Sequence, residues 1–485
     1  MNALMLSLLL SIGASAPASA QANGGALDPE QLMREGHPVE ALEAARAGVR
    51  AAPQNVEKHE LLIDLMNNLG LALQGEIAYL QFAQDNEQDP MAWYLLGRAA
   101  LDPVRAGTAY AKALSLEPSY ARATMGLASV QRALGEAEDS VELYRQAVTA
   151  QPGLAEAWSG LGATLMDQGK VSEALEVCLK AMVAVPRDRE AYLAASVLEP
   201  DMALDHLQRG VKAIPASPEL RAALGRIQLR DGNYKQAKAN LDLALSSDPG
   251  AVQAIFDRAV VGELEAGRLD TDGQAMLARA RSLIQESPVA AELGVRDLVN
   301  QYPDCYLVYL VQGHLFIGLA REIEAVTSLS KALELQPTSP DVQGALGMLL
   351  LNMGDAGGAL PLLNSAYSAR PWDVELGVSA GMAAANATGI NTGVTALGAV
   401  ADAHPTELAP VMALVTLLSQ AGRPDMAYQV LSRAVSRYPH PTLILSKAAA
   451  AQDLGRKAEA AALLRELEEL TGDSKYGSMA KELEP

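Results

Sequence analysis

Proline returns every 34 residues through most of this 485-residue chain. The same interval separates Pro118, Pro152 and Pro186, then Pro303, Pro337, Pro371, Pro405 and Pro439, and in a shifted frame Pro215 and Pro249. A fixed period of this size predicts stacked copies of one supersecondary unit rather than one closed globular domain. Such an architecture offers a long surface for binding. The period alone does not indicate which partner is bound.

The segment Ala155–Pro186 shows what one unit contains. Its marked positions are, in order, Trp158, Leu161, Gly162, Gly169, Ala174, Cys178, Ala181 and Pro186. Apolar residues recur at helical spacing on both sides of Gly169, which predicts two helices with a break between them. Gly162 and Ala174 are expected to be small because the two helices cross closely there. Pro186 cannot continue the second helix.

This order of residues resembles the tetratricopeptide repeat family, whose pattern has Trp-x2-Leu-Gly at its start, Ala-x3-Phe in its second half and a closing Pro. The same phase fits some twelve or thirteen units between about residues 26 and 475. The resemblance implies an all-α fold: a right-handed α-α superhelical solenoid of about twelve to thirteen helix pairs.

Departures from the period suggest how the array is divided. Between Pro249 and Pro303, Ala251–Ala266, Gly273–Gln285 and Val289–Gln301 are predicted to form three helices rather than two. The alternative is one lengthened loop. We therefore expect an N-terminal array at 21–251, an irregular helical segment with a possible bend at 252–305, a C-terminal array with a capping helix at 306–475, and a tail at 476–485. The capping helix carries an apolar stripe of Leu463, Leu464, Leu467 and Leu470.

Charge and hydropathy restrict the possible partners. The formal net charge is -20 and the pI is about 4.8. Such a surface repels a phosphate backbone or an anionic lipid leaflet, so we expect no nucleic-acid partner. Stable membrane insertion is not expected either. The longest late apolar run, Leu408–Ala421, is short and contains Pro410.

The first twenty residues have the features of an export signal. Leu4–Ile12 is a short apolar core, and Ala18, Ser19 and Ala20 precede Gln21 as a small-residue cleavage site. The positively charged segment usual before such a core is missing. We expect residues 1–20 to be cleaved and the mature protein to be soluble and exported, to the periplasm if the source is a Gram-negative bacterium.

Residues for catalysis or cofactor binding are not grouped in the sequence. The six histidines are scattered, and no zinc, phosphate-loop, nucleophile-elbow or dinucleotide motif is present. Cys178 and Cys305 lie more than three periods apart, so no disulfide is expected between them. The sequence therefore predicts no cofactor, no metal and no enzymatic activity.

The family resemblance implies that the first helix of each pair lines an inner, concave surface where peptides or partner segments bind. In the C-terminal half this surface would be apolar and rich in methionine, which adapts to varied shapes. The candidate residues are Leu310, Met348, Leu351, Asn352, Val378, Met382, Asn386, Met412 and Gln420. Asn352, Asn386 and Gln420 stand at 34-residue steps and could form an amide ladder. Alternatively, these residues belong to the core or simply end helices.

In the N-terminal half the inward positions carry mixed charges. They include Arg122, Arg132, Glu156, Asp167, Glu219, Arg226 and Arg230. Arg122, Arg226 and Arg230 could meet acidic groups of a partner, although such charges are commonly just a solvated surface. The sequence favours a non-catalytic scaffold that binds protein or peptide segments in the cell envelope. The alternative is an assembly or export factor for envelope polysaccharide or outer-membrane proteins, and an enzyme is less favoured.

Overall fold

The computed structural model describes residues 28–34 and 37–483. These residues form 28 α-helices and one short 3-10 helix, and they contain no strand. The predicted all-α fold is therefore confirmed. The predicted signal segment, residues 1–20, lies outside the described residues. Among the helices that are described, none is both long and apolar enough to cross a membrane.

The chain divides into two compact units, one made of Met1–Val185 with Asp402–Pro485 and the other of Pro186–Ala401. The predicted boundaries at 252 and 305 both fall inside the second unit. The helices of the first unit are α2 (Pro29–Arg34), α3 (Pro38–Ala51), α4 (Val56–Asn68), α5 (Ala72–Asp85), α6 (Pro90–Ala99), α7 (Pro103–Leu116), α8 (Ala121–Ala133), α9 (Ala137–Ala150), α10 (Ala155–Asp167), α11 (Val171–Ala184), α25 (Leu408–Gln420), α26 (Pro424–Arg437), α27 (Pro441–Asp453), α28 (Lys457–Thr471) and α29 (Ser474–Leu483). Those of the second unit are α12 (Arg189–Leu198), η2 (Pro200–Met202), α13 (Ala203–Ala213), α14 (Pro218–Arg230), α15 (Tyr234–Ser247), α16 (Val252–Glu265), α17 (Thr271–Glu286), α18 (Pro288–Gln301), α19 (Tyr306–Gly318), α20 (Glu322–Leu335), α21 (Pro340–Asn352), α22 (Ala356–Ala369), α23 (Val374–Thr388) and α24 (Ile390–Ala403), which ends just past the boundary.

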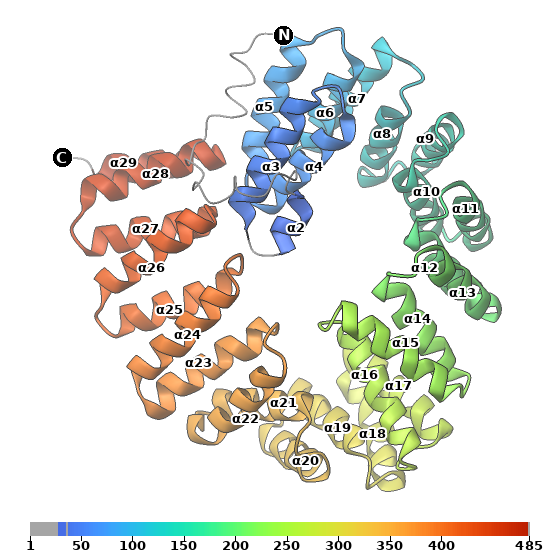
Figure 1. The fold of residues 1–485 in the computed structure, drawn as a ribbon, viewed down its shortest axis with the longest axis vertical. Coiled ribbons are helices and arrows are strands. Elements are labelled where there is room, and N and C mark those ends of the chain that lie inside the picture. The colour runs from blue at the N-terminus through green and yellow to red at the C-terminus, as the bar shows by residue number, and fades with distance from the viewer. Residues whose placement is uncertain (1–27, 35–36, 484–485) are drawn as a thin grey trace. The chain divides into compact units, whose positions relative to one another are not determined.

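Within each unit the helices pack as consecutive pairs, and each pair packs against the next (Figure 1). The first helices of neighbouring pairs also contact each other, as α4, α6, α8 and α10 do in the first unit and α21 and α23 do in the second. Each helix therefore buries its apolar stripe against its sequence neighbours, which is the packing of a helix-pair solenoid.

Most turns within a pair end the first helix with a residue in the left-handed region. Gly169 has φ +71°, and the Lys170 N–H bonds back to the carbonyl of Leu165. This geometry satisfies helix-end carbonyls and favours glycine because it has no Cβ. Ala320 holds the same place after α19 with φ 55°, and it is the one residue other than glycine with positive φ in the described part of the chain.

The start of a pair is fixed by a recurring bond from a side chain to a backbone carbonyl. Six side chains near the start of a first helix each donate to a carbonyl oxygen six residues earlier, at 2.7–3.1 Å: His59 to Pro53, Trp93 to Glu87, Trp158 to Pro152, Tyr192 to Pro186, Arg221 to Pro215 and Gln343 to Pro337. Different residue types make the same bond. The fourth residue of the first helix therefore makes this bond even in repeats that lack the tryptophan.

The two helices of a pair cross where a glycine meets a leucine sixteen residues later. A Cβ placed on Gly225 would lie 2.7 Å from Leu241 Cγ and 3.2 Å from the Ala237 carbonyl oxygen. At Gly162, however, the nearest atom is Cys178 Sγ at 3.9 Å, an ordinary contact. The predicted close crossing at Gly162 is therefore wrong, because the smaller cysteine leaves room there.

This difference predicts opposite effects of one substitution. Gly225→Ala should destabilise the protein by about 1–3 kcal/mol, since the added methyl group overpacks against Leu241. Gly162→Ala should be neutral or should stabilise by up to about 1 kcal/mol, because alanine favours the helix and meets no close atom. Thermal denaturation followed by far-UV circular dichroism measures both. Equal losses in the two variants would show that crossing distance does not decide the effect.

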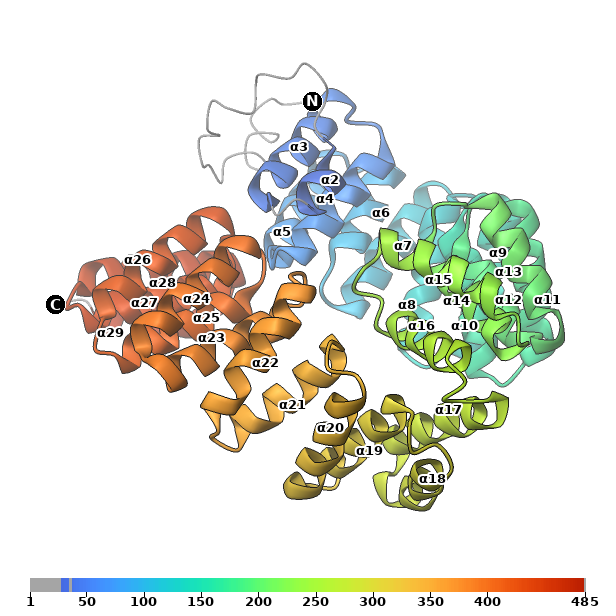
Figure 2. The same cartoon turned by 60° about the horizontal axis from the view of Figure 1, so that its bottom comes forward.

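The interval between Pro249 and Pro303 contains the three predicted helices, α16, α17 and α18. α17 packs with α18 as a pair, and α17 also contacts α19, as the first helices of adjacent pairs do (Figure 2). α16 is therefore the additional helix. The buried Glu263, near its end, pairs with Arg268 at 2.5 and 3.0 Å, and this ion pair holds the turn between α16 and α17.

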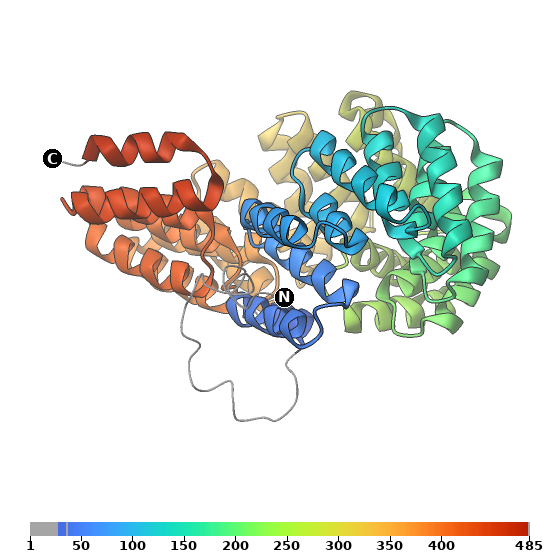
Figure 3. The ribbon, with the colours of Figure 1, turned by 90° about the horizontal axis from the view of Figure 1, so that it is seen from above.

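The last described helices close the end of the array. Leu463, Leu464, Leu467 and Leu470 of α28 are buried, as their stripe predicts. α29 packs on α28 and occupies most of the region expected to be a tail (Figure 3). A second helix on α28 explains how this apolar stripe is covered at the end of the stack.

Candidate functional site

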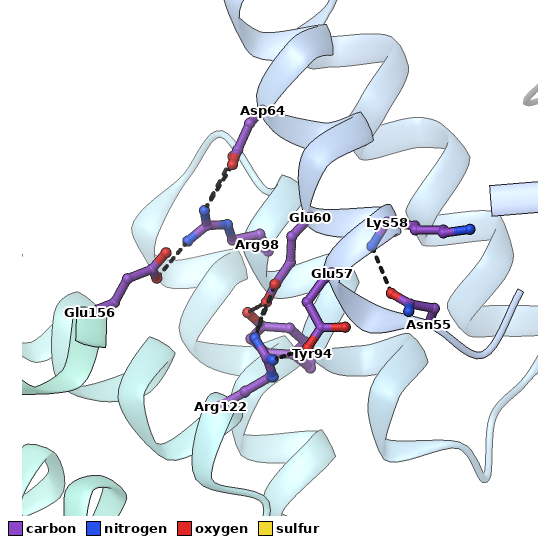
Figure 4. A network of polar contacts seen from close by, with 9 residues as sticks. All are labelled: Asn55, Glu57, Lys58, Glu60, Asp64, Tyr94, Arg98, Arg122 and Glu156. Atoms are coloured by element: carbon purple, nitrogen blue, oxygen red, sulfur yellow. Dashed lines mark hydrogen bonds and ion pairs between the residues drawn. The ribbon is translucent and has the colours of Figure 1, made fainter. Parts of the chain in front are cut away.

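Side chains of α4, α6, α8 and α10 form two neighbouring bonded groups in the first unit, one around Arg122 and one around Arg98, which we together call the charged network (Figure 4). The Arg122 guanidinium donates to both carboxylate oxygens of Glu60 at 2.9 and 3.0 Å and to Glu57 at 2.8 Å. The Tyr94 hydroxyl donates to the same Glu60 carboxylate. These partners lie 34 to 65 residues apart in the chain, so the Tyr94 bond joins successive helix pairs and the Arg122 bonds join pairs that are one further apart.

A second arginine connects three helix pairs. Arg98 donates to both carboxylate oxygens of Asp64 and to Glu156 Oε2, all at 3.2 Å. Burial alone would lower the pKa of Arg98, but the Glu156 and Asp64 carboxylates raise it above its ordinary value. Arg98 is therefore charged at any physiological pH. The network runs along the first helices from α4 to α10.

The network leaves an excess of negative charge on this face. Four carboxylates, those of Glu57, Glu60, Asp64 and Glu156, face two guanidinium groups, and the side chains of Glu57 and Glu156 are 67% and 64% exposed. Solvent can therefore reach these two carboxylates and that of Asp64, which is 49% exposed, while Glu60 is largely buried. A partner with positive charge would meet these exposed groups first.

The arginines that could have met acidic groups of a partner are bonded within the chain. Arg122 binds Glu57 and Glu60 as described, Arg226 donates to Asp257 at 2.9 Å, and Arg230 donates to Asp231 at 3.1 Å. The other predicted inward charges also have partners, Asp167 with Arg132 and Glu219 with Arg189. Only the three-dimensional stacking reveals these pairings, because most of the partners lie about one repeat apart.

In α21 and α23 of the second unit some of the equivalent helix positions are apolar, although the second residue of each helix, Asp341 and Glu375, is acidic. In the charged network, residues from the second, fifth and ninth positions of the first helices meet one another. Val378 is the fifth residue of α23, and Met348 and Met382 are the ninth residues of α21 and α23. All three are partly exposed. Met348 also packs against the core beneath it.

The remaining candidates differ in exposure. Asn352 and Asn386 are exposed near the ends of α21 and α23, and Leu351 is partly buried against the core. In the first unit, Met412 of α25 is partly exposed, with its Sδ 3.6 Å from Ser446 Oγ, and Gln420 is exposed. Leu310 must be removed from the predicted surface. It is 3% exposed and belongs to the core that includes Leu277 of α17, because α17 packs against α19.

One cleft was missed by sequence reasoning. A hollow of about 340 Å³ lies between α18 and α19, with the apolar Val289, Leu293 and Phe316 next to Glu292 and Arg321 in its wall. Arg321 stacks over the Phe316 ring at 4.5 Å and donates to Glu292 at 2.6 Å. Val289 and Leu293 are 72% and 64% exposed, and these exposed residues on a helix of the irregular segment were the available signal.

The described residues provide little for catalysis. They contain no group of three or more histidine, cysteine or acidic side chains that could hold a metal ion. Both cysteines are buried, and neither forms a disulfide. Burial, together with the nearby Glu263 carboxylate, raises the pKa of the Cys305 thiol to about 12, so this thiol is not a nucleophile at neutral pH.

Comparison with known proteins gives two family matches. A model described as tetratrico peptide repeat matches residues 100–194, and one described as tetratricopeptide repeat matches residues 218–250, which contain the pair α14–α15. No curated protein matches the chain.

Several solved structures are similar in fold. The APC/C hetero-tetramer Cut9–Hcn1 is 14% identical with a TM-score of 0.32, and the match covers 100% of this chain and 99% of that chain. PilW, a type IV pilus biogenesis factor, is 16% identical with a TM-score of 0.35, covering 43% and 98%. YrrB, described as a TPR protein with an unusual peptide-binding site, is 17% identical with a TM-score of 0.28, covering 49% and 96%.

Proposed function

Because the chain is a tetratricopeptide-repeat protein, we propose that it is a non-catalytic scaffold that binds extended segments of partner proteins on the inner faces of its helix arrays. A stack of preformed helix pairs can bind a partner with little ordering cost of its own. Its function would then depend on which side chains the first helices present, rather than on a reactive pocket.

The observation that carries this proposal is that equivalent helix positions have two different chemistries. In α4 the second, fifth and ninth residues are the carboxylates Glu57, Glu60 and Asp64, which meet Arg98 of α6 and Arg122 of α8, and the second residue of α10 is Glu156. The fifth and ninth positions are apolar in α23, and the ninth is methionine in both α21 and α23. From Pro371 to Gly422 the sequence contains no Lys or Arg. The α21–α23 face therefore suits an apolar segment, and the α4–α10 face suits a basic one.

The apolar face can be tested with charged substitutions. Met348→Glu combined with Met382→Glu should reduce crosslinked capture of the partner from extracts of the source cells at least tenfold, because binding would then bury two carboxylates. Far-UV helicity should be retained, since both methionines are partly exposed. A loss of helicity would instead identify them as core residues.

Matched variants locate the binding face. Ile323→Glu places the same charge at a 78% exposed position on the second helix α20 and should leave capture unchanged. Glu57→Gln with Glu156→Gln neutralises the two most exposed carboxylates of the charged network. If this pair abolishes capture while the methionine variant does not, the partner binds the α4–α10 face. If neither variant reduces capture, the inner faces are not the binding site.

We further propose that the scaffold acts in the cell envelope after export. The support is the apolar core Leu4–Ile12 followed by the small residues before Gln21. N-terminal sequencing of the protein from its source should then begin at Gln21. A mature protein that retains Met1 would contradict this location.

A further inference from the structure

Two parts of the first unit that are far apart in the sequence touch at their ends. α5 contacts α28, and Figures 1 and 2 both show these helices next to each other. On one side the contact consists of Asn68, Gly70, Leu73 and Gln74, and on the other of Tyr438, His440, Pro441, Leu470 and Gly472. We call this contact the terminal clasp.

Each side of the terminal clasp caps a helix of the other side. The Gln74 side-chain amide donates to the carbonyl of Leu470, near the end of α28. The Tyr438 hydroxyl donates to the carbonyl of Asn68, the last residue of α4, at 3.4 Å. Carbonyls in the last turn of a helix lack partners within the helix, so both acceptors are groups that need a bond from elsewhere. The exchange is reciprocal.

Glycine allows the two sides to approach. Gly70 follows α4 and has φ +73°, and a Cβ there would lie 3.2 Å from Pro441 Cδ and 3.4 Å from the His440 ring. Gly472 follows α28 with φ +67°, and a Cβ there would lie 2.7 Å from Leu73 Cδ2. Several other helix-ending glycines, Gly135 among them, have no atom within 4 Å of this point. Gly70 and Gly472 therefore serve the contact in addition to ending their helices.

The terminal clasp is connected to the charged network through α4. This helix carries Glu57, Glu60 and Asp64 on its inner face and provides the Asn68 carbonyl at its end. Contacts between successive helix pairs bury whole apolar faces. The terminal clasp instead consists of the side-chain bonds of Gln74 and Tyr438 and the close approach of other residues to Gly70 and Gly472. It is therefore the weaker of the two kinds of contact.

We propose that the terminal clasp opens and closes while both sets of helices stay folded, and that it holds α4 in the position that assembles the charged network. Opening would free α4 to move relative to α8, and so loosen the bonds from Arg122 to Glu57 and Glu60. This inference rests on contacts within the chain and does not depend on the proposed function.

Spin-label distances test the proposal in the full chain without a partner. Labels are attached at Ile77→Cys on α5 and Glu466→Cys on α28, two exposed positions, while Cys178 and Cys305 are buried. Double electron–electron resonance should give a predominantly short, narrow distance distribution. Gly70→Asn combined with Gln74→Ala should shift it to longer, broader distances with helicity unchanged, because asparagine tolerates the backbone conformation and its Cβ meets Pro441.

Gly135→Asn is the matched control. It places the same residue at a glycine with φ +85° and open space, so the distance distribution should not change. A long, broad distribution before any clasp substitution would contradict the contact itself. An unchanged distribution in the Gly70→Asn and Gln74→Ala variant would show that these groups do not hold it. Loss of helicity in that variant, with the control intact, would show that the contact cannot open independently of folding.

Discussion

Replacing Tyr110 with alanine should reduce the free energy of unfolding by about 3–5 kcal/mol, the range for deleting a buried aromatic ring. The ring of this α7 residue is 6% exposed and fits between two glycines of first helices. A Cβ on Gly97 would lie 2.5 Å from the ring, and one on Gly126 would lie 2.4 Å from it. Urea denaturation followed by circular dichroism measures the loss.

A second substitution shows whether the ring's volume is the cause. Gly126→Ala in the unmodified protein should destabilise by about 1–3 kcal/mol through overpacking. In the Tyr110→Ala background the same methyl group enters the cavity, so its effect should become neutral or favourable. Tyr234→Ala, at a partly exposed tyrosine, should cost less than Tyr110→Ala. If Gly126→Ala costs the same in both backgrounds, the glycine is not required by the ring.

Replacing Arg268 with alanine should destabilise the protein by about 3 kcal/mol, because it leaves the Glu263 carboxylate buried without its partner. Glu263 is 2% exposed and is held by Arg268 at 2.5 and 3.0 Å. We take the low end of the range for broken buried pairs because Arg268 is 43% exposed and water can replace part of its contribution. Thermal and urea denaturation measure the change.

Two variants identify the cause of that loss. Arg145→Ala breaks the exposed pair with Glu173 at 2.7 Å and should cost less than about 1 kcal/mol. Glu263→Gln added to Arg268→Ala removes the buried charge and should restore part of the stability. If the double variant is no more stable than Arg268→Ala alone, the loss arises from packing of the arginine stem rather than from the carboxylate.

Much of the fold follows from local sequence signals. Proline after most second helices and glycine after most first helices set the helix pairs, and apolar spacing distinguishes helix from loop even between Pro249 and Pro303. These signals act within one pair, so a single sequence contains them. The pattern also identified Trp158 as a residue of the repeat. It did not indicate that Tyr192, Arg221 and Gln343 make the same bond.

The candidate site was less predictable because it depends on contacts between pairs. The bonds of Arg122 to Glu60 and Glu57 span 62 and 65 residues, and no local pattern indicates which carboxylate an arginine will meet. Leu310 stands at an inward position by spacing, but the packing of α17 against α19 buries it. The cleft between α18 and α19 depends on how these two helices pack against each other. Apolar spacing along the chain predicts the helices but not their packing.

The terminal clasp also has a consequence for how the protein is made. Almost every other bond between helix pairs joins residues that leave the ribosome close together, so each pair can fold on its predecessor during synthesis. The bond from Tyr438 to Asn68 spans 370 residues, and that from Gln74 to Leu470 spans 396. The clasp can therefore form only when translation is nearly complete. A nascent chain that stalls before residue 470 would carry folded helix pairs without this closing contact.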